Sequence, residues 1–212
     1  MALVKRTEDE TSSTNETASA PKTDDELQQL LHSKNPLERR QAAQDIVDSS
    51  GATRLLLNQL MQEKSSVVRQ VILTSLTRIG DHDAVVGLAD CLRSEDARLR
   101  NDAIEAMKEL PEQVAGIVEE LLADDDPDVR IFTVNILESL RHEHVEQWLI
   151  DVLDHDDHIN VVCTALDLRG EVGTEAAIPA LQRVVSRYSD EAYVQFAADM
   201  ALKRIQSSAE PQ

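Results

Sequence analysis

Four arginines recur along the chain at nearly constant intervals. Arg39, Arg69, Arg100 and Arg130 are separated by 30, 31 and 30 residues. Each lies near the start of a segment with apolar residues at helical spacing, and a second apolar segment follows before the next arginine. A period in this range with two helices per unit is typical of solenoids, in which each unit stacks on its neighbours. The spacing therefore predicts a row of helical hairpins instead of a compact globule.

The stretch DDDPDVRIFTVNILESL, residues 124–140, shows how one unit is built. Asp126 is placed to cap a helix with its carboxylate, and Pro127 suits the first helical position. The residues expected on the buried face of this helix are Val129, Thr133, Ile136, Leu137 and Leu140. After the turn RHEH, the segment VEQWLIDVL has the pattern of a second helix. The stretches around the other three arginines follow the same plan.

The last two units depart from this plan. Val162 and Gln195 stand where the arginine is expected, and the final unit stops after one helix. We therefore expect the ladder of charge interactions between neighbouring repeats to stop after the fourth unit. The segment DDELQQLL at the front and the lone final helix are typical of caps that cover the apolar ends of a stack. Gly80 and Gly173 follow first helices, at places where a left-handed residue commonly ends a helix.

These patterns predict an all-α protein, with a right-handed α-solenoid of about five helical-hairpin repeats and a C-terminal capping helix over residues 24–206. Residues 1–23 are rich in Ser, Thr, Glu and Asn and have almost no apolar residue after Val4, so we expect a flexible tail. Within this tail, ALVKR is either a short docking motif or simply the beginning of the chain. Residues 207–212 are expected to form a flexible C-terminus.

The second unit contains the most complete copy of the repeat, formed by Val68, Arg69, Ile72, Leu76, Ile79 and Gly80. This copy resembles the short HEAT-like repeat of the phycobilin-lyase type, which has a Val-Arg pair, regularly placed apolar residues and a closing Gly-x-Ile-Gly. The resemblance covers roughly residues 24–206. It implies an α-solenoid of the kind commonly used to bind proteins, with the second helices lining a concave face.

The charge of the chain disfavours several classes of partner. With 40 acidic and 21 basic side chains, the formal net charge is -19. Nucleic acid and anionic membranes are poor partners, because binding to phosphate relies on clustered Lys and Arg. No segment has the length and apolarity of a signal peptide core or a membrane span. Cys91 and Cys163 lie in apolar helical patterns, as expected of reduced core thiols, so we expect a cytoplasmic protein.

No pattern in the sequence indicates a catalytic, cofactor or metal site. Deoxyhypusine hydroxylase, which the array resembles in architecture, holds iron with several His-Glu pairs, whereas only His142-Glu143 occurs here. The HEAT-like alkylpurine DNA glycosylases use a basic groove with aromatic residues, and this chain is acidic with few aromatic residues. The segment HDDH at 155–158 is expected to be a solvated loop. We expect the four arginines to be structural, each bridging to an aspartate of an adjacent repeat.

Alignment of the second helices suggests which side chains face a partner. The core positions in register are Leu56, Leu88, Val118, Leu149 and Leu181. The residues two positions further on form a mostly acidic row of Asn58, Asp90, Glu120, Asp151 and Arg183. The residues just before the core positions form an apolar row that we expect to be half-exposed, made of Leu55, Gly87, Ile117, Trp148 and Ala180. Trp148 is either an anchor for a partner or packed over a small neighbour.

We therefore predict a non-enzymatic adaptor that acts as a regulatory or assembly factor. Its concave groove, with Asp90, Glu120, Trp148 and Asp151, would bind a basic or amphipathic segment of another protein. Two alternatives remain open. One is a lyase-like or cofactor-insertion factor of the phycobilin-lyase kind that acts on a partner protein, and the other is a purely structural spacer.

Overall fold

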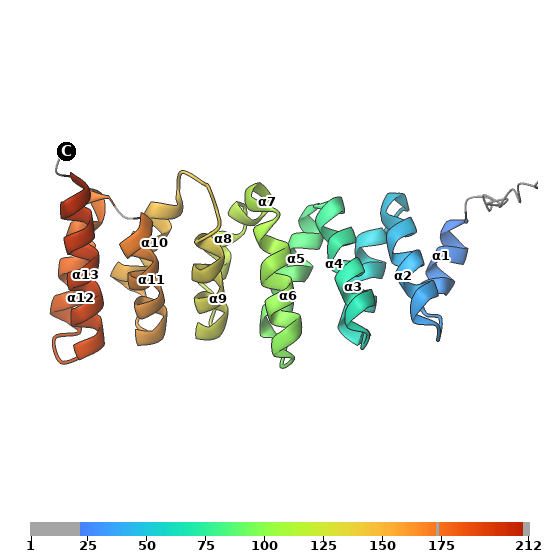
Figure 1. Ribbon diagram of the computed structural model, residues 1–212, viewed down its shortest axis with the longest axis horizontal. Coiled ribbons are helices and arrows are strands. Elements are labelled where there is room, and N and C mark those ends of the chain that lie inside the picture. The colour runs from blue at the N-terminus through green and yellow to red at the C-terminus, as the bar shows by residue number, and fades with distance from the viewer. Residues whose placement is uncertain (1–21, 173, 210–212) are drawn as a thin grey trace, which may run out of the picture.

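The computed structural model describes residues 22–172 and 174–209, without the side chains of residues 169–172, 208 and 209. This part of the chain is built from α-helices joined by turns and short 3-10 segments, and it contains no strand. Figure 1 shows the helices side by side in one elongated row, with α1 at one end and α12 and α13 at the other. The architecture is the α-solenoid that the repeat predicts.

Five helical hairpins lie between an N-terminal helix, α1 (Asp24–Leu31), and a C-terminal helix, α13 (Ala192–Ala209), in the described residues. The first helices of the hairpins are α2 (Pro36–Asp45), α4 (Ser66–Ile79), α6 (Ala97–Lys108), α9 (Pro127–Leu137) and α11 (Ile159–Val172). The second helices are α3 (Ala52–Gln62), α5 (His82–Asp90), α7 (Pro111–Ala115) with α8 (Val118–Leu122), α10 (Val145–His155) and α12 (Ile178–Arg187). In the described residues, three 3-10 segments adjoin these helices: η1 (Ile46–Asp48) follows α2, η2 (Cys91–Arg93) follows α5 and η3 (Glu175–Ala177) precedes α12.

One continuous apolar core runs along the row. First helices pack on first helices of the next repeat, such as α2 on α4 and α11 on α13, and second helices pack likewise, such as α3 on α5. The five core positions predicted from the second helices, Leu56, Leu88, Val118, Leu149 and Leu181, are all 0% exposed. The register of the repeat is therefore confirmed. No helix in the described residues has both the length and the apolarity needed to cross a membrane.

Local signals set the ends of several helices. The Asp126 carboxylate accepts a hydrogen bond from the Asp128 N–H at 2.9 Å, and Pro127 is the first residue of α9, as predicted. Gly80 closes α4 with a φ of 57°, a left-handed conformation that glycine adopts without strain. Gly51, which precedes α3 with a φ of 74°, was not singled out by the repeat pattern. Gly173 lies outside the described residues.

The two ends of the array differ slightly from the predicted boundaries. Thr23, which we assigned to the tail, caps α1 through a hydrogen bond from the Glu26 N–H at 3.3 Å. The Glu26 carboxylate accepts a bond from the Thr23 N–H in return, which completes a capping box. The preceding Lys22 pairs with Asp45 at 3.0 Å. At the other end, α13 continues to Ala209, beyond the predicted limit at residue 206. ALVKR lies outside the described residues.

The second helix of the third repeat is interrupted, although the plan of the repeat predicts one continuous helix. α7 ends at Ala115, and α8 begins at Val118 after Gly116 and Ile117. Ile117 has a φ of -122° and a ψ of 0°, outside the helical range. Glycine is less favourable than alanine in a helix by about 1 kcal/mol, so the chain loses little by leaving the helix at Gly116.

Gly87 allows α3 and α5 to approach closely. A Cβ atom built at Gly87 would lie 2.3 Å from Leu57 Cδ1 and 2.9 Å from Leu57 Cγ. Both distances are far shorter than a van der Waals contact between carbon atoms. The half-buried Leu57 side chain would have to move for any larger residue to be accommodated.

Gly87→Ala is therefore expected to lower the free energy of unfolding by about 1–2 kcal/mol, although alanine is the better helix former. Urea denaturation of the two proteins measures the difference. A second substitution, Leu57→Ala, removes the clashing side chain, so the double variant should lose less than the two single variants together. Gly116→Ala is the control, because a Cβ there meets only Gln113 O at 3.3 Å. Equal losses at Gly87 and Gly116 would contradict the close approach.

Candidate partner-binding surface

The four repeated arginines occupy equivalent places beside the turns between repeats. Each donates a hydrogen bond to the carbonyl oxygen of the residue six positions earlier. The acceptors are Ser33 at 2.8 Å from Arg39, Glu63 at 3.1 Å from Arg69, Ser94 at 2.5 Å from Arg100 and Asp124 at 2.7 Å from Arg130. Each arginine thus closes the turn that leads into its own helix, through a charge-assisted bond to the backbone.

Three of these arginines also reach a carboxylate in the next turn along the row. The ion pairs are Arg39–Glu63 at 2.7 Å, Arg69–Asp96 at 3.1 Å and Arg130–Asp156 at 2.7 Å. Arg100 instead lies over the ring of Phe132, at 5.6 Å from the ring centroid. Between the turn that precedes α6 and the turn that precedes α9, the ion pair is formed by Arg93 with Asp124. Successive turns between repeats are therefore connected by an arginine ladder, which we define as these arginines and their acceptors.

The prediction that charge interactions stop after the fourth unit is wrong. Val162 is buried at the position of the missing arginine, but two arginines of α12 replace it. Arg183 forms an ion pair with Asp154 at 2.7 Å, and Arg187 donates to the Asp154 carbonyl oxygen at 2.9 Å. The prediction failed because it considered a single position of the first helix, whereas these arginines come from a second helix.

Glu63 is the most enclosed acceptor of the arginine ladder, with its side chain 1% exposed. Its two carboxylate oxygens accept bonds from Arg39 Nε and Nη2, each at 2.7 Å. The Ser65 N–H and the Gln59 amide also donate to it, each at 2.9 Å. Burial by itself raises the pKa of this carboxyl group, but the four hydrogen bonds outweigh burial and lower the pKa to about 2. Glu63 is therefore ionised at neutral pH.

The mostly acidic row on the second helices is exposed along the array. Its members are Asn58, Asp90, Glu120, Asp151 and Arg183. Asp151 accepts a bond from the Gln147 amide at 2.9 Å, and Arg183 is held by Asp154. The structure therefore places Asp90, Glu120 and Asp151 at solvent-facing positions of α5, α8 and α10. Among these three carboxylates, only that of Asp151 borders the hollow between α8 and α10 that is described below.

Trp148 lies differently from the expected half-exposed position. It is 6% exposed, and Ile117 and Ala180 of the same row are also buried, so the expectation of a half-exposed row is wrong at these three residues. The Trp148 ring stacks on that of His142, with centroids 5.1 Å apart and planes 11° apart. Its indole Nε1 donates to Glu119 Oε1 at 3.4 Å. These contacts hold the tryptophan within the fold, as in its packing alternative, but the ring packs on a histidine and not on a small neighbour.

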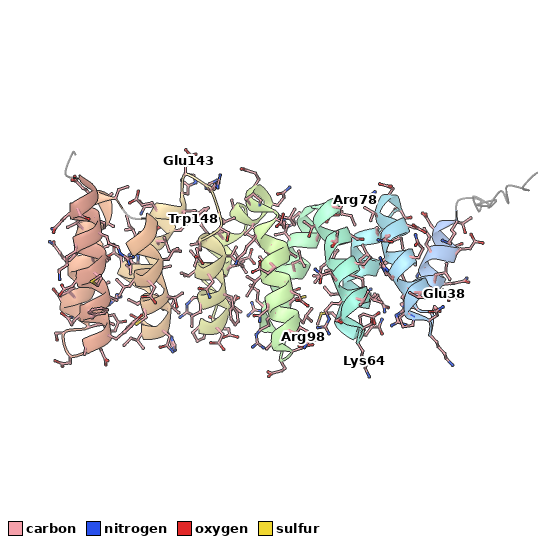
Figure 2. The ribbon with its side chains drawn as sticks, viewed as in Figure 1. Glu38, Lys64, Arg78, Arg98, Glu143 and Trp148 are labelled. Carbon is pink, nitrogen blue, oxygen red and sulfur yellow. The ribbon has the colours of Figure 1, made fainter. Side chains whose placement is uncertain are left out.

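A hollow of about 650 Å³ opens between α8 and α10, and we call it the α8–α10 hollow. Leu122, Trp148 and Val152 form its apolar wall. Its ionisable side chains are mostly acidic, with Glu119, Asp124, Asp125, Asp151, Asp156 and Asp157 against Arg130 and His155. In Figure 2, Trp148 lies on α10 close to the α9–α10 connection that carries Glu143. An apolar wall with a surplus of carboxylates suits a cationic side chain with an aliphatic stem.

The sequence alignment identified Asp151 and missed the other five carboxylates of this hollow, among them Asp124 and Asp156 of the arginine ladder. Glu119 lies beside the aligned residue Glu120 on α8, and Asp125 and Asp157 lie in turns between repeats. The alignment compared one equivalent position in each second helix and did not include the turns between repeats. A usable signal existed, because acidic residues cluster in two consecutive turns, at 124–126 and at 156–157.

The histidines and cysteines of the described residues form no site for a metal ion. No group of three or more His, Cys, Asp or Glu side chains in that part of the chain is arranged to hold one. In the HDDH segment, the Nδ1 atom of His155 lies 3.0 Å from the carbonyl oxygen of Asp151, which precedes the segment. Burial raises the pKa of the Cys91 thiol to about 11, and the pKa of Cys163 is raised for the same reason. Both thiols are therefore protonated at neutral pH.

Comparison with solved structures finds several similar proteins. The chain is similar to human deoxyhypusine hydroxylase in complex with glycerol, at 16% identity over 87% of this chain and 84% of that chain, with a TM-score of 0.46. It is also similar to the complex of CpcE and CpcF of phycocyanin lyase from Nostoc sp. PCC7120, at 17% identity over 95% and 99% of the two chains, with a TM-score of 0.38.

A third similar structure is the archaeal HEAT-like repeats protein from Thermococcus onnurineus NA1, at 16% identity over 84% of this chain and 87% of that chain, with a TM-score of 0.41. No curated protein matches the sequence. The family model of HEAT repeats matches residues 23–108 and 114–210, which cover the five hairpins except for the start of α7. The chain therefore belongs to the HEAT-repeat family.

Proposed function

We propose that this protein is a non-enzymatic, cytoplasmic adaptor that acts as a regulatory or assembly factor by holding a basic segment of another protein. The observation that carries the proposal is the α8–α10 hollow, where the apolar wall of Trp148 and Val152 is bordered by carboxylates. Asp125, Asp151 and Asp157 lie at this hollow outside the arginine ladder. They are exposed, so they are directed at an incoming partner.

A lysine or arginine of the partner suits this hollow in two ways. Its aliphatic stem packs against Trp148 and Val152, and its charged head reaches Asp151 or Asp157. Trp148 adds the attraction of its ring for a cation. The formal net charge of -19 speeds the encounter with a basic segment, because the field of the whole protein attracts it over a distance.

The exposed carboxylates on neighbouring second helices extend the surface beyond this hollow. Asp90, Glu120 and Asp151 occupy equivalent positions in three consecutive repeats. Helices in direct contact lie about 8–10 Å apart, and a hollow separates α8 from α10, so the three carboxylates recur at about that interval or a larger one. Two residues seven positions apart on a helix are separated by about 10.5 Å. An amphipathic helix with a basic residue every seventh position therefore matches this row of carboxylates.

The triple variant Asp90→Lys, Glu120→Lys and Asp151→Lys tests the proposal. Its affinity for a fluorescein-labelled amphipathic peptide of lysine and leucine should fall about tenfold or more, because three attractive contacts become repulsive. Fluorescence anisotropy at about 0.15 M salt measures the affinity. The circular dichroism spectrum should be unchanged, since all three side chains are exposed. An affinity equal to that of the wild type would show that the row does not bind the peptide.

A matched control separates this surface from net charge. Glu105→Lys, Glu138→Lys and Asp199→Lys change the total charge equally but lie on the first-helix side of the array. This variant should bind the peptide within about threefold of the wild type, since only long-range attraction is weakened. Equal losses of affinity in the two triple variants would show that the peptide is bound only through non-specific charge attraction. An absorbance shift on addition of a tetrapyrrole would instead favour a cofactor-insertion factor of the phycobilin-lyase kind.

A further inference from the structure

The C-terminal helix α13 carries apolar side chains on two opposite faces. Its inner face, with Val194, Ala198 and Ile205, is buried against the rest of the array. On the outer face, Tyr193 is 53% exposed, Phe196 is 64% exposed and Met200 is 37% exposed. These three residues are spaced i, i+3 and i+7, so they form one continuous stripe along the helix. We call Tyr193, Phe196 and Met200 the α13 stripe.

The α13 stripe borders a shallow hollow, and the side chain of its first residue, Tyr193, is held by a hydrogen bond. A hollow of about 260 Å³ lies between the stripe and α11, where Leu166 and Asp167 line it. The Tyr193 hydroxyl donates to the Asp167 carboxylate, with both carboxylate oxygens at 2.9 Å. This hydrogen bond raises the pKa of Tyr193 and holds its ring across the gap between the two helices. The hollow can receive a large side chain from another molecule.

Charge changes sign from one end of the α13 stripe to the other. Asp190 and Glu191 immediately precede α13, and both are exposed. Lys203 and Arg204 lie on the same face, one helical turn beyond Met200, and both are exposed. The surface is thus acidic, then apolar, then basic along a single direction. Such a surface is complementary to a copy of itself turned end over end.

We propose that two copies of this protein pair through antiparallel α13 helices around a two-fold axis. The axis lies at the level of residue 198 on the outer face of α13, so that Phe196 of each copy faces Met200 of the other copy. The acidic beginning of one α13 then lies beside Lys203 and Arg204 of the other. A two-fold interface uses the same patch on both subunits, so it must be self-complementary, as this surface is. Figure 1 places α13 at the end of the row, where a second array can approach.

The size of the stripe sets the strength of the pairing. A helix of 18 residues is about 27 Å long, so the contact lies at the small end of specific interfaces. We expect a dissociation constant on the order of tens of micromolar. The net charge of -19 repels the two copies, but at about 0.15 M salt the Debye length is about 8 Å, so charges away from the contact are largely screened.

Sedimentation velocity between about 1 and 300 µM, at that salt concentration, tests the pairing. The full chain should pass from monomer to dimer, and Phe196→Glu should weaken the dimer at least about tenfold, because it places a carboxylate in the centre of the apolar contact. Leu37→Glu, at a residue that is 70% exposed near the other end of the array, should leave the dimer unchanged. A wild type that stays monomeric at 300 µM, or equal dimerisation of both variants, would overturn the proposal.

Complementary charge reversals test the antiparallel arrangement. Variant one carries Asp190→Lys and Glu191→Lys, and variant two carries Lys203→Glu and Arg204→Glu. Each variant alone brings like charges together at both ends of the contact and should dimerise at least about tenfold more weakly than the wild type. An equimolar mixture restores opposite charges at both ends and should form a heterodimer of wild-type strength. If the mixture dimerised no more strongly than the separate variants, the antiparallel pairing would be contradicted, however each variant behaves alone.

Discussion

Replacing Glu63 by glutamine is expected to lower the free energy of unfolding by about 3 kcal/mol at pH 7. The folded protein holds the pKa of this carboxyl group at about 2, against 4.5 for an ordinary glutamate, and that difference corresponds to roughly 3 kcal/mol. Glutamine keeps the shape of the side chain but leaves Arg39, itself only 15% exposed, without its anionic partner. Urea denaturation followed by circular dichroism gives the two free energies.

The same substitution should flatten the acid side of the stability profile. Because the pKa of Glu63 is lowered in the folded state, the unfolded chain binds more protons at this site between pH 4.5 and about 2. The contribution of Glu63 is therefore fully present above pH 4.5 and is lost as the pH falls through this window. The stability difference between wild type and Glu63→Gln should shrink from about 3 kcal/mol at pH 7 towards zero near pH 2.

Arg183→Gln is the control for this prediction. Arg183 also forms an ion pair with a carboxylate of a neighbouring repeat, at the same 2.7 Å, but its side chain is 59% exposed. An exposed ion pair contributes little, so this variant should lose less than about 1 kcal/mol. If Glu63→Gln lost no more than Arg183→Gln, burial of the Arg39–Glu63 pair would have no consequence for stability.

Ala198→Asp is expected to detach the C-terminal helix and to destabilise that end of the array by about 3–5 kcal/mol. Ala198 is 0% exposed on the inner face of α13, so the new carboxylate would be buried without a cation or would force the helix away. Loss of α13 in turn uncovers apolar residues of α11, including Val161, Val162 and Leu166. A solenoid is stabilised by contacts between neighbours, so the damage should spread inward from this end.

Hydrogen exchange measured by mass spectrometry distinguishes local from global loss. In Ala198→Asp, amides of α11 and α12 should lose protection, while those of α2 to α4 stay close to wild type. Gln206→Asp introduces the same carboxylate on an exposed position of α13 and should change protection only near the end of the helix. Uniform loss of protection along the whole chain in Ala198→Asp would show that the array unfolds as one unit, contrary to this expectation.

Periodicity alone predicted most of the fold. A repeat of about 30 residues assigns each apolar position to the same place in every unit, and the five aligned core residues of the second helices are indeed all buried. Helix ends were predictable where a single residue decides them, as at Asp126 and Gly80. The break at Gly116 was not, because it depends on a small difference between two acceptable backbone paths.

The candidate binding surface was less predictable, because it depends on contacts between repeats. The sequence placed Asp90, Glu120 and Asp151 in one exposed row, yet it could not show that Trp148 folds back onto His142. Nor did the pattern show that arginines from α12 would continue the ladder, since a repeat pattern compares equivalent positions only. Interactions between non-equivalent positions of neighbouring units require the relative placement of the helices.

The α-helices pack within one hairpin or onto adjacent hairpins, and this arrangement governs how the chain can lengthen or shorten over evolution. An in-frame duplication or deletion of a complete period brings together two helical surfaces that are already complementary. The resulting protein is then a longer or shorter array with intact contacts between its repeats. A change of half a period instead sets a first helix against a second helix and breaks every junction at that point. Inheritance of length in this molecule is therefore stepwise, in units of one hairpin.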